Sequence, residues 1–170
     1  MTDFVENNQS GSENTPPLKI LVADDDALNQ RLMKILLTNE GYQVDAVSNG
    51  LEAVDAIKYR QFDIVFMDLR MPVMDGIEAS QRIREWEEGG WHTYIVALTA
   101  SYLPEEGQML FEAGMDNYIS KPFQMEHLQR MLKYIVKARS TSSSSIVSES
   151  ELPSNETLRI QNEQNICAEQ

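Results

Sequence analysis

Short apolar runs alternate with amphipathic segments between residues 18 and 138 of this chain. The apolar runs have the length of strands, and the segments between them repeat apolar residues at helical spacing. Such alternation is typical of βα units, which build a parallel sheet covered by helices. We therefore predict one α/β domain of five βα units. Its expected strands are 18–23, 42–47, 62–67, 94–98 and 117–120.

The segments between the strands carry the usual signals of helix starts and stops. Asp26 and Pro104 suit the beginnings of two helices, Gly41 suits a left-handed stop, and Gly114 suits the end of the helix that Pro104 begins. An apolar stripe on four of the five helices should pack on the sheet. The stripe residues are Leu28, Leu32, Ile35 and Leu36; Leu51, Val54 and Ile57; Ile77, Ile83 and Trp86; and Leu128, Met131, Leu132, Ile135 and Val136.

The two ends of the chain differ from its middle in composition. Residues 1–17 are polar and end in two prolines, and residues 139–170 begin with a serine-rich run and continue with many acidic and polar residues. Neither segment can bury enough apolar surface to offset the entropy of ordering. We expect a disordered leader at 1–17, a domain at 18–138 and a flexible tail at 139–170.

Charge and composition exclude several function classes. A formal net charge of -13 opposes direct DNA binding, which needs clustered Lys and Arg. No apolar stretch approaches the roughly 18 residues that suggest a membrane span. The single Cys167 can form no internal disulfide, and the first residues lack the apolar core of a signal peptide. A reducing, cytoplasmic location is the expectation.

Polar side chains follow the predicted strands at their carboxyl ends. Asp24 and Asp25 follow the first strand, Asp68 follows the third, Thr99 the fourth and Lys121 the fifth. Carboxyl ends of neighbouring parallel strands meet at one edge of a sheet, so these groups are expected to converge.

This set of side chains suits phosphoryl chemistry. Grouped carboxylates repel one another unless a cation neutralises them, and their hard oxygens suit Mg2+. Asp68 then serves as a nucleophile for phosphoryl transfer, while the metal and Lys121 stabilise charge on the transferring oxygens. Thr99 can donate a hydrogen bond to the same group. Asp26 is interpreted as a helix cap rather than as a further ligand.

Residues 18–138, with these landmarks in this order, resemble the receiver domain of two-component response regulators. The resemblance implies a flavodoxin-like, doubly wound sheet with strand order 2-1-3-4-5. It also implies Asp68 as the phospho-acceptor. The implied Mg2+ ligands are Asp25 directly, Asp24 largely through water, Asp68, and the backbone carbonyl of Arg70.

The resemblance assigns further roles to residues near the same edge. Thr99 corresponds to a switch hydroxyl, and Tyr118 to an aromatic side chain that rotates on activation. The Lys121-Pro122 bond is expected to be cis. Arg70 and Ser101 correspond to positions that tune the lifetime of the phosphoryl group.

The function expected from this reading is that of a single-domain response regulator. A histidine kinase or histidine phosphotransfer protein supplies the phosphoryl group, and the protein then binds an unknown downstream partner, relays the phosphate, or forms a homodimer. Its only catalysis would be its own phosphorylation and dephosphorylation. Two alternatives stay open: a Mg2+-dependent phosphatase or phosphotransferase with an aspartyl-phosphate intermediate, and a binding module that needs no phosphate.

Overall fold

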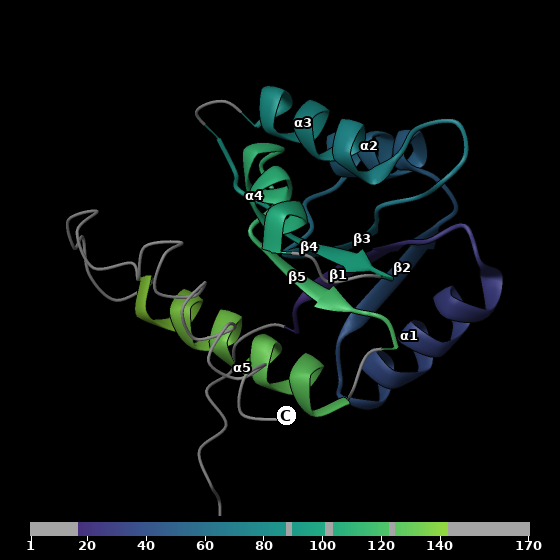
Figure 1. Ribbon diagram of the computed structural model, residues 1–170. Coiled ribbons are helices and arrows are strands. Elements are labelled where there is room, and N and C mark those ends of the chain that lie inside the picture. The colour runs from purple at the N-terminus through teal and green to yellow at the C-terminus, as the bar shows by residue number, and fades with distance from the viewer. Residues whose placement is uncertain (1–16, 88–89, 101–103, 123–124, 143–170) are drawn as a thin grey trace, which may run out of the picture.

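The computed structural model of the 170-residue chain describes residues 17–87, 90–100, 104–122 and 125–142 (Figure 1). Nearly all of the expected leader and tail lie outside these residues, as does Ser101. Among the described helices, none is both long and apolar enough to cross a membrane.

Five parallel strands form one sheet in the order β2-β1-β3-β4-β5, and five helices cover it. The predicted flavodoxin-like α/β fold is confirmed. The strands are β1 (Lys19–Ala23), β2 (Gln43–Val47), β3 (Ile64–Asp68), β4 (Tyr94–Thr99) and β5 (Asn117–Ser120). The helices are α1 (Ala27–Asn39), α2 (Gly50–Tyr59), α3 (Gly76–Trp86), α4 (Pro104–Glu112) and α5 (Met125–Ser142).

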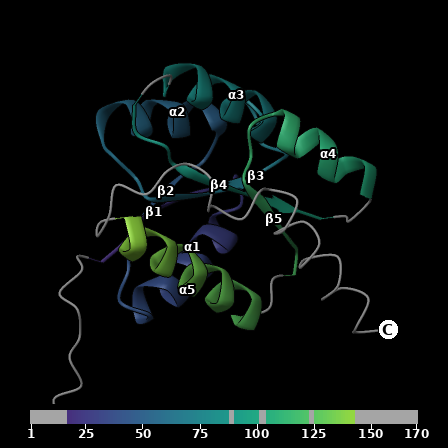
Figure 2. The same cartoon turned by 90° about the vertical axis from the view of Figure 1, so that its left-hand side faces the viewer.

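The helices divide between the two faces of the sheet. Helices α1 and α5 lie on one face, and α2, α3 and α4 lie on the other, as the end-on view shows (Figure 2). Successive side chains of a strand point to opposite faces, so Val22 and Phe66 pack toward α1 and α5 while Ala23 and Met67 pack toward α2 and α3. These four side chains are fully buried, which explains why the central strands read as continuous apolar runs.

Several helix ends form as the sequence predicted. The Asp26 side chain accepts a hydrogen bond from the Leu28 backbone N–H and caps α1. Gly41 follows α1 with φ +91° and Gly114 follows α4 with φ +86°, a region that suits glycine because it has no Cβ. Pro104 begins α4.

The predicted orientation of α1 is wrong. Leu28 is 72% exposed and Leu32 and Ile35 are also exposed, whereas Met33 and Leu37 are buried against the sheet. Apolar residues occupy most of the circumference of this helix, so periodicity alone did not separate its buried face from its outer face.

Two other stripe residues lie outside the buried faces of their helices. Leu51 is exposed because the buried face of α2 contains Ala53, Val54 and Ile57. Trp86 is exposed because the buried face of α3 runs through Ala79, Ser80 and Ile83. The apolar positions predicted for α5 are confirmed: all five are buried or packed against the core.

An ion cluster occupies the amino-terminal edge of the sheet, where β4 and β5 begin. The guanidinium of Arg84 in α3 donates to Glu87 and Asp116 at 2.6 Å each. It also donates to the carbonyl oxygens of Thr93 at 2.9 Å and Gly114 at 2.8 Å. This Arg84 cluster joins α3 to the segments that lead into β4 and β5.

Candidate functional site

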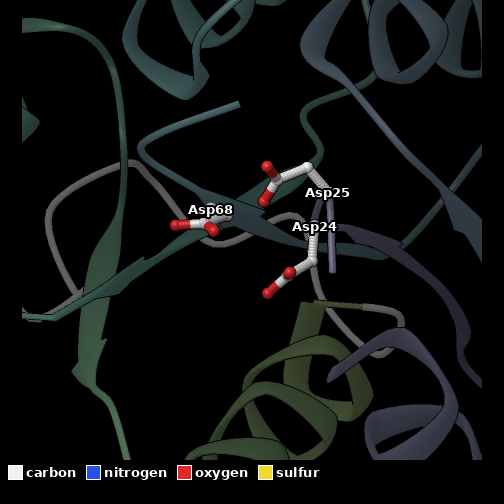
Figure 3. A group of neighbouring side chains, drawn as sticks. All are labelled: Asp24, Asp25 and Asp68. Atoms are coloured by element: carbon white, nitrogen blue, oxygen red, sulfur yellow. The ribbon is translucent and has the colours of Figure 1, made fainter. Parts of the chain in front are cut away.

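Three aspartates meet at the carboxyl-terminal edge of the sheet (Figure 3). Asp24 and Asp25 follow β1, and Asp68 is the last residue of β3. One oxygen from each carboxylate lies within 4.8 Å of the others. Asp24 is only 1% exposed, Asp68 is partly buried and Asp25 is exposed. The predicted convergence of these acids is confirmed.

Lys121, which follows β5, pairs with two of these acids. Its ammonium nitrogen lies 2.8 Å from Asp24 Oδ2 and 2.9 Å from Asp68 Oδ2. Burial alone acts to lower the pKa of Lys121, but the hydrogen bonds and charges of Asp24 and Asp68 outweigh it and raise that pKa above its ordinary value. These two carboxylates therefore hold the lysine in its charged form.

The predicted cis bond between Lys121 and Pro122 is present.

The charges at this edge leave room for a cation. Three carboxylates face one ammonium, so with all of them ionised the group has a net charge of two negatives. All the ligand atoms are hard oxygens, and Mg2+ characteristically takes one or two carboxylates and keeps several waters. The residues present fit a Mg2+ ion by charge, by ligand type and by spacing.

The Asp24 carboxylate has polar partners that the sequence analysis missed. Asp26 donates its backbone N–H to Oδ1 at 2.9 Å. The Asn29 amide nitrogen lies 3.2 Å from Oδ1 and 3.3 Å from Oδ2. Asn29 lies four residues before the buried Met33 and so shares the inner face of α1, but the sequence pattern did not identify that face.

Gln30 joins two loops at this edge. Its amide nitrogen donates to the Asp24 carbonyl oxygen at 2.7 Å, to the Val47 carbonyl oxygen at 3.0 Å and to Ser48 Oγ at 3.1 Å. The second of these loops also reaches the loop after Asp68, because the Gly50 backbone N–H donates to the Met74 carbonyl at 3.0 Å. The β2–α2 loop therefore braces the two loops that carry the acids.

Asp68 is placed by close packing between β3 and α3. A Cβ atom added to Gly76, the first residue of α3, would collide with the backbone carbonyl of Asp68. The Gly76 backbone N–H also donates to the Leu69 carbonyl at 3.1 Å. Arg70 is exposed, and its backbone N–H lies 3.4 Å from Asp68 Oδ1. The metal and lifetime roles of Arg70 stay predictions.

The two predicted switch residues lie on neighbouring strands. Thr99 ends β4, is buried, and accepts the Lys121 backbone N–H at its carbonyl oxygen at 2.6 Å. Tyr118 in β5 is buried on the α4 side of the sheet, where its ring meets Phe111 edge-on at 6.3 Å. The structure thus brings Thr99 to the same edge as Lys121, while the switching roles of Thr99 and Tyr118 and the lifetime role of Ser101 stay predictions.

A family model, the response regulator receiver domain, matches residues 20–133 of this chain. The chain therefore belongs to the receiver domain family of two-component signalling. Members of this family are typically not enzymes apart from their own phosphorylation chemistry.

Curated relatives of this chain include sensor kinases. It is 37% identical over 139 residues to the sensor histidine kinase GacS of Pseudomonas protegens, covering 78% of this chain and 15% of that protein. It is also 37% identical over 145 residues to hybrid signal transduction histidine kinase I of Dictyostelium discoideum, covering 78% of this chain and 8% of that protein. The chain thus spans less than a fifth of the length of these relatives.

Solved receiver structures have the same fold. A receiver domain of a sensor histidine kinase from Pseudomonas aeruginosa, solved with a magnesium ion in its active site cleft, is 36% identical with a TM-score of 0.65, over 71% of this chain and 98% of that one. A second match is to the crystal structure of the Saccharomyces cerevisiae phosphotransfer protein Ypd1 in complex with the receiver domain of Ssk1. The match has 30% sequence identity and a TM-score of 0.65, and it covers 68% of this chain and 86% of that chain.

Proposed function

We propose that this domain accepts a phosphoryl group on Asp68 in a Mg2+-dependent reaction. The observation that carries the proposal is the meeting of Asp24, Asp25 and Asp68 with Lys121 at one edge of the sheet. A carboxylate beside bound Mg2+ and a mobile ammonium is a suitable nucleophile for phosphoryl transfer. The magnesium-bound receiver from Pseudomonas aeruginosa supports the choice of metal.

The residues divide the chemistry among them. One oxygen of Asp68 attacks the phosphorus atom of a phosphohistidine donor, and the new P–O bond forms as the P–N bond breaks. The donor imidazole leaves with the electron pair of that bond and takes up one proton from solvent, so that it departs as neutral imidazole. Lys121 exchanges its pairing with Asp68 for a pairing with the phosphoryl oxygens. Bound Mg2+ would neutralise negative charge on those oxygens; Asp25, Asp68 and the Arg70 carbonyl would hold it directly, and Asp24 largely through water.

The donor is proposed to be a histidine kinase or a histidine phosphotransfer protein. The kinase relatives and the complex of Ypd1 with the Ssk1 receiver domain support this choice. Thr99 and Tyr118 would then shift the surface toward binding a downstream protein or a second copy, or the phosphate would be relayed. Arg70 and Ser101 would set how long the phosphoryl group persists.

Phosphorylation with a small donor tests the proposal. The full chain is incubated with acetyl phosphate and Mg2+, and intact mass spectrometry is expected to show one added phosphoryl group that maps to Asp68. Asp68→Asn should abolish the adduct, whereas Asp55→Asn, the same change at an exposed position of α2, should leave it. An adduct that persists in Asp68→Asn would contradict the assignment.

The same incubation separates the two alternatives. Turnover of many phosphate esters per molecule of protein would indicate a phosphatase or phosphotransferase. The absence of any adduct in the presence of Mg2+ would indicate a module that binds partners without phosphate. A single stable adduct with slow loss of phosphate is the result that the proposal requires.

A further inference from the structure

Asn29 lies in the third position of α1, where its side chain reaches back to the Asp24 carboxylate. Its amide nitrogen lies 3.2 Å from Oδ1 and 3.3 Å from Oδ2, so it donates to both carboxylate oxygens. A carboxylate can only accept, so the amide nitrogen rather than the amide oxygen faces Asp24. This amide therefore holds the carboxylate symmetrically.

The usual task of a polar residue at this helix position is already filled. A Glu or Gln in the third position often accepts the backbone N–H of the capping residue, and here that residue is Asp26. The Asp26 N–H instead donates to Asp24 Oδ1 at 2.9 Å. Because the Asp26 N–H is paired without it, the Asn29 side chain is available for the acidic group.

Asp24 needs such a partner because its carboxyl torsion is otherwise broad. In the structure its carboxylate is held by Lys121, Asn29 and the Asp26 N–H. If Lys121 moves to a transferred phosphoryl group, only the other two of these partners stay with Asp24. Of these partners, Asn29 is then the side chain that still orients the carboxylate, together with the backbone N–H of Asp26.

We infer that Asn29 is a positioning residue for the metal site: its amide orients the Asp24 carboxylate toward the Mg2+ ion held with Asp25 and Asp68. This inference rests on the proposed function. Partners that orient a metal ligand without touching the metal commonly contribute about 10- to 100-fold to metal affinity.

Magnesium binding to the full, unphosphorylated chain tests the inference. Asn29→Leu removes the amide while keeping a side chain of similar size, and Asn39→Leu makes the same change at the exposed last residue of the same helix. Isothermal titration calorimetry with MgCl2 gives the Kd of each protein. We expect the Kd to rise about tenfold in Asn29→Leu and to stay close to the wild-type value in Asn39→Leu.

A second readout separates orientation from general stability. In the magnesium-free protein, the 13C resonance of the Asp24 carboxyl carbon should shift in Asn29→Leu and not in Asn39→Leu. If Asn29→Leu does not fold, Asn29→Ala removes the same amide without adding apolar bulk.

The outcomes distinguish this inference from the proposed function. If the wild type binds Mg2+ and the Asn29 variant binds it equally well, the positioning role is overturned and the metal site stands. An equal loss of affinity in the Asn39 variant would also overturn it. If the wild type binds no Mg2+, both the metal site and its positioning residue are overturned.

Discussion

Asp24 and Lys121 form an ion pair around a buried carboxylate at the end of an apolar strand. Desolvation opposes charge at both residues, and the ion pair at 2.8 Å offsets it only while both partners remain. The buried Asp24 carboxylate would therefore destabilise the fold if it lost its cationic partner. In the proposed reaction Lys121 moves from Asp68 to the phosphoryl oxygens. Its ion pairs in the unphosphorylated protein must therefore be stable and yet able to exchange.

Replacement of Lys121 by Met should reveal that dependence. Removing the ammonium leaves Asp24, which is 1% exposed, without its cationic partner. We expect the free energy of unfolding near neutral pH, without divalent cations, to fall by about 3 kcal/mol. Urea unfolding of wild type and variant in the presence of a chelator measures it. An unchanged free energy would show that the pair contributes nothing net.

The sign of the pH dependence follows from the raised pKa of Lys121. A cation whose pKa is higher in the folded state contributes its full stability below its ordinary value of 10.5 and loses it as the pH rises through the folded-state value. The stability difference between wild type and Lys121→Met should therefore shrink above pH 10.5. Tyr94, whose pKa burial raises to about 12, titrates in both proteins and cancels from the difference.

At the residue scale the sequence predicted the acids better than their supports. Asp24, Asp68, Thr99 and Lys121 could be placed together because parallel strands deliver their ends to one edge. Asn29 could not, because its role depends on how far α1 is rotated about its own axis.

The contact between β3 and α3 depends on one glycine. Gly76→Ala would place a Cβ against the Asp68 carbonyl and 2.9 Å from Met67 Cγ, so the strand end or the helix start has to move. We expect a loss of about 2 kcal/mol in the free energy of unfolding, typical of overpacking, together with slower phosphorylation of Asp68. Denaturant unfolding and the acetyl phosphate reaction measure the two effects.

Gly90→Ala is the matched control for that substitution. A Cβ at Gly90 would lie 3.7 Å from the Glu87 carbonyl oxygen, an ordinary contact, and away from the acidic edge. Its phosphorylation rate should equal that of the wild type. An equal slowing in both variants would show that the Gly76 contact has no special effect on Asp68.

At the element scale α1 shows why a correct helix can be predicted with the wrong face inward. Asn29, Met33 and Leu37 are spaced by four residues and share the inner face. The inner face carries Met33 and Leu37, and the outer face carries apolar residues as well, such as Leu28 and Leu32. The apolar pattern therefore did not show which face is buried. The polar contacts of Asn29 and Gln30 with Asp24 are consistent with the observed rotation, and these tertiary contacts are invisible in a single-sequence pattern.

At the scale of the whole molecule, the Arg84 cluster joins segments that are distant in sequence. Arg84→Leu would leave Glu87 and Asp116 without their shared guanidinium, and Glu87 is buried. We expect the free energy of unfolding to fall by about 3 kcal/mol. The control is Arg82→Leu in the same helix, whose exposed pair with Glu78 should contribute less than about 1 kcal/mol.

Equilibrium unfolding in urea compares the two arginine variants directly. Equal losses of stability in both would contradict the importance assigned to the Arg84 cluster. Phosphorylation of Asp68 is expected to continue in Arg84→Leu at temperatures where the variant stays folded, because the Arg84 cluster lies at the opposite edge of the sheet.

The separation of these two charged groups has a practical meaning for anyone who wishes to redesign the domain. Strand β4 runs from one edge to the other, and its six residues span roughly 20 Å. Substitutions that far apart with no shared partner usually act additively. Substitutions at the amino-terminal edge should therefore raise or lower the thermal stability of the domain without changing the rate of the proposed phosphorylation at the other edge.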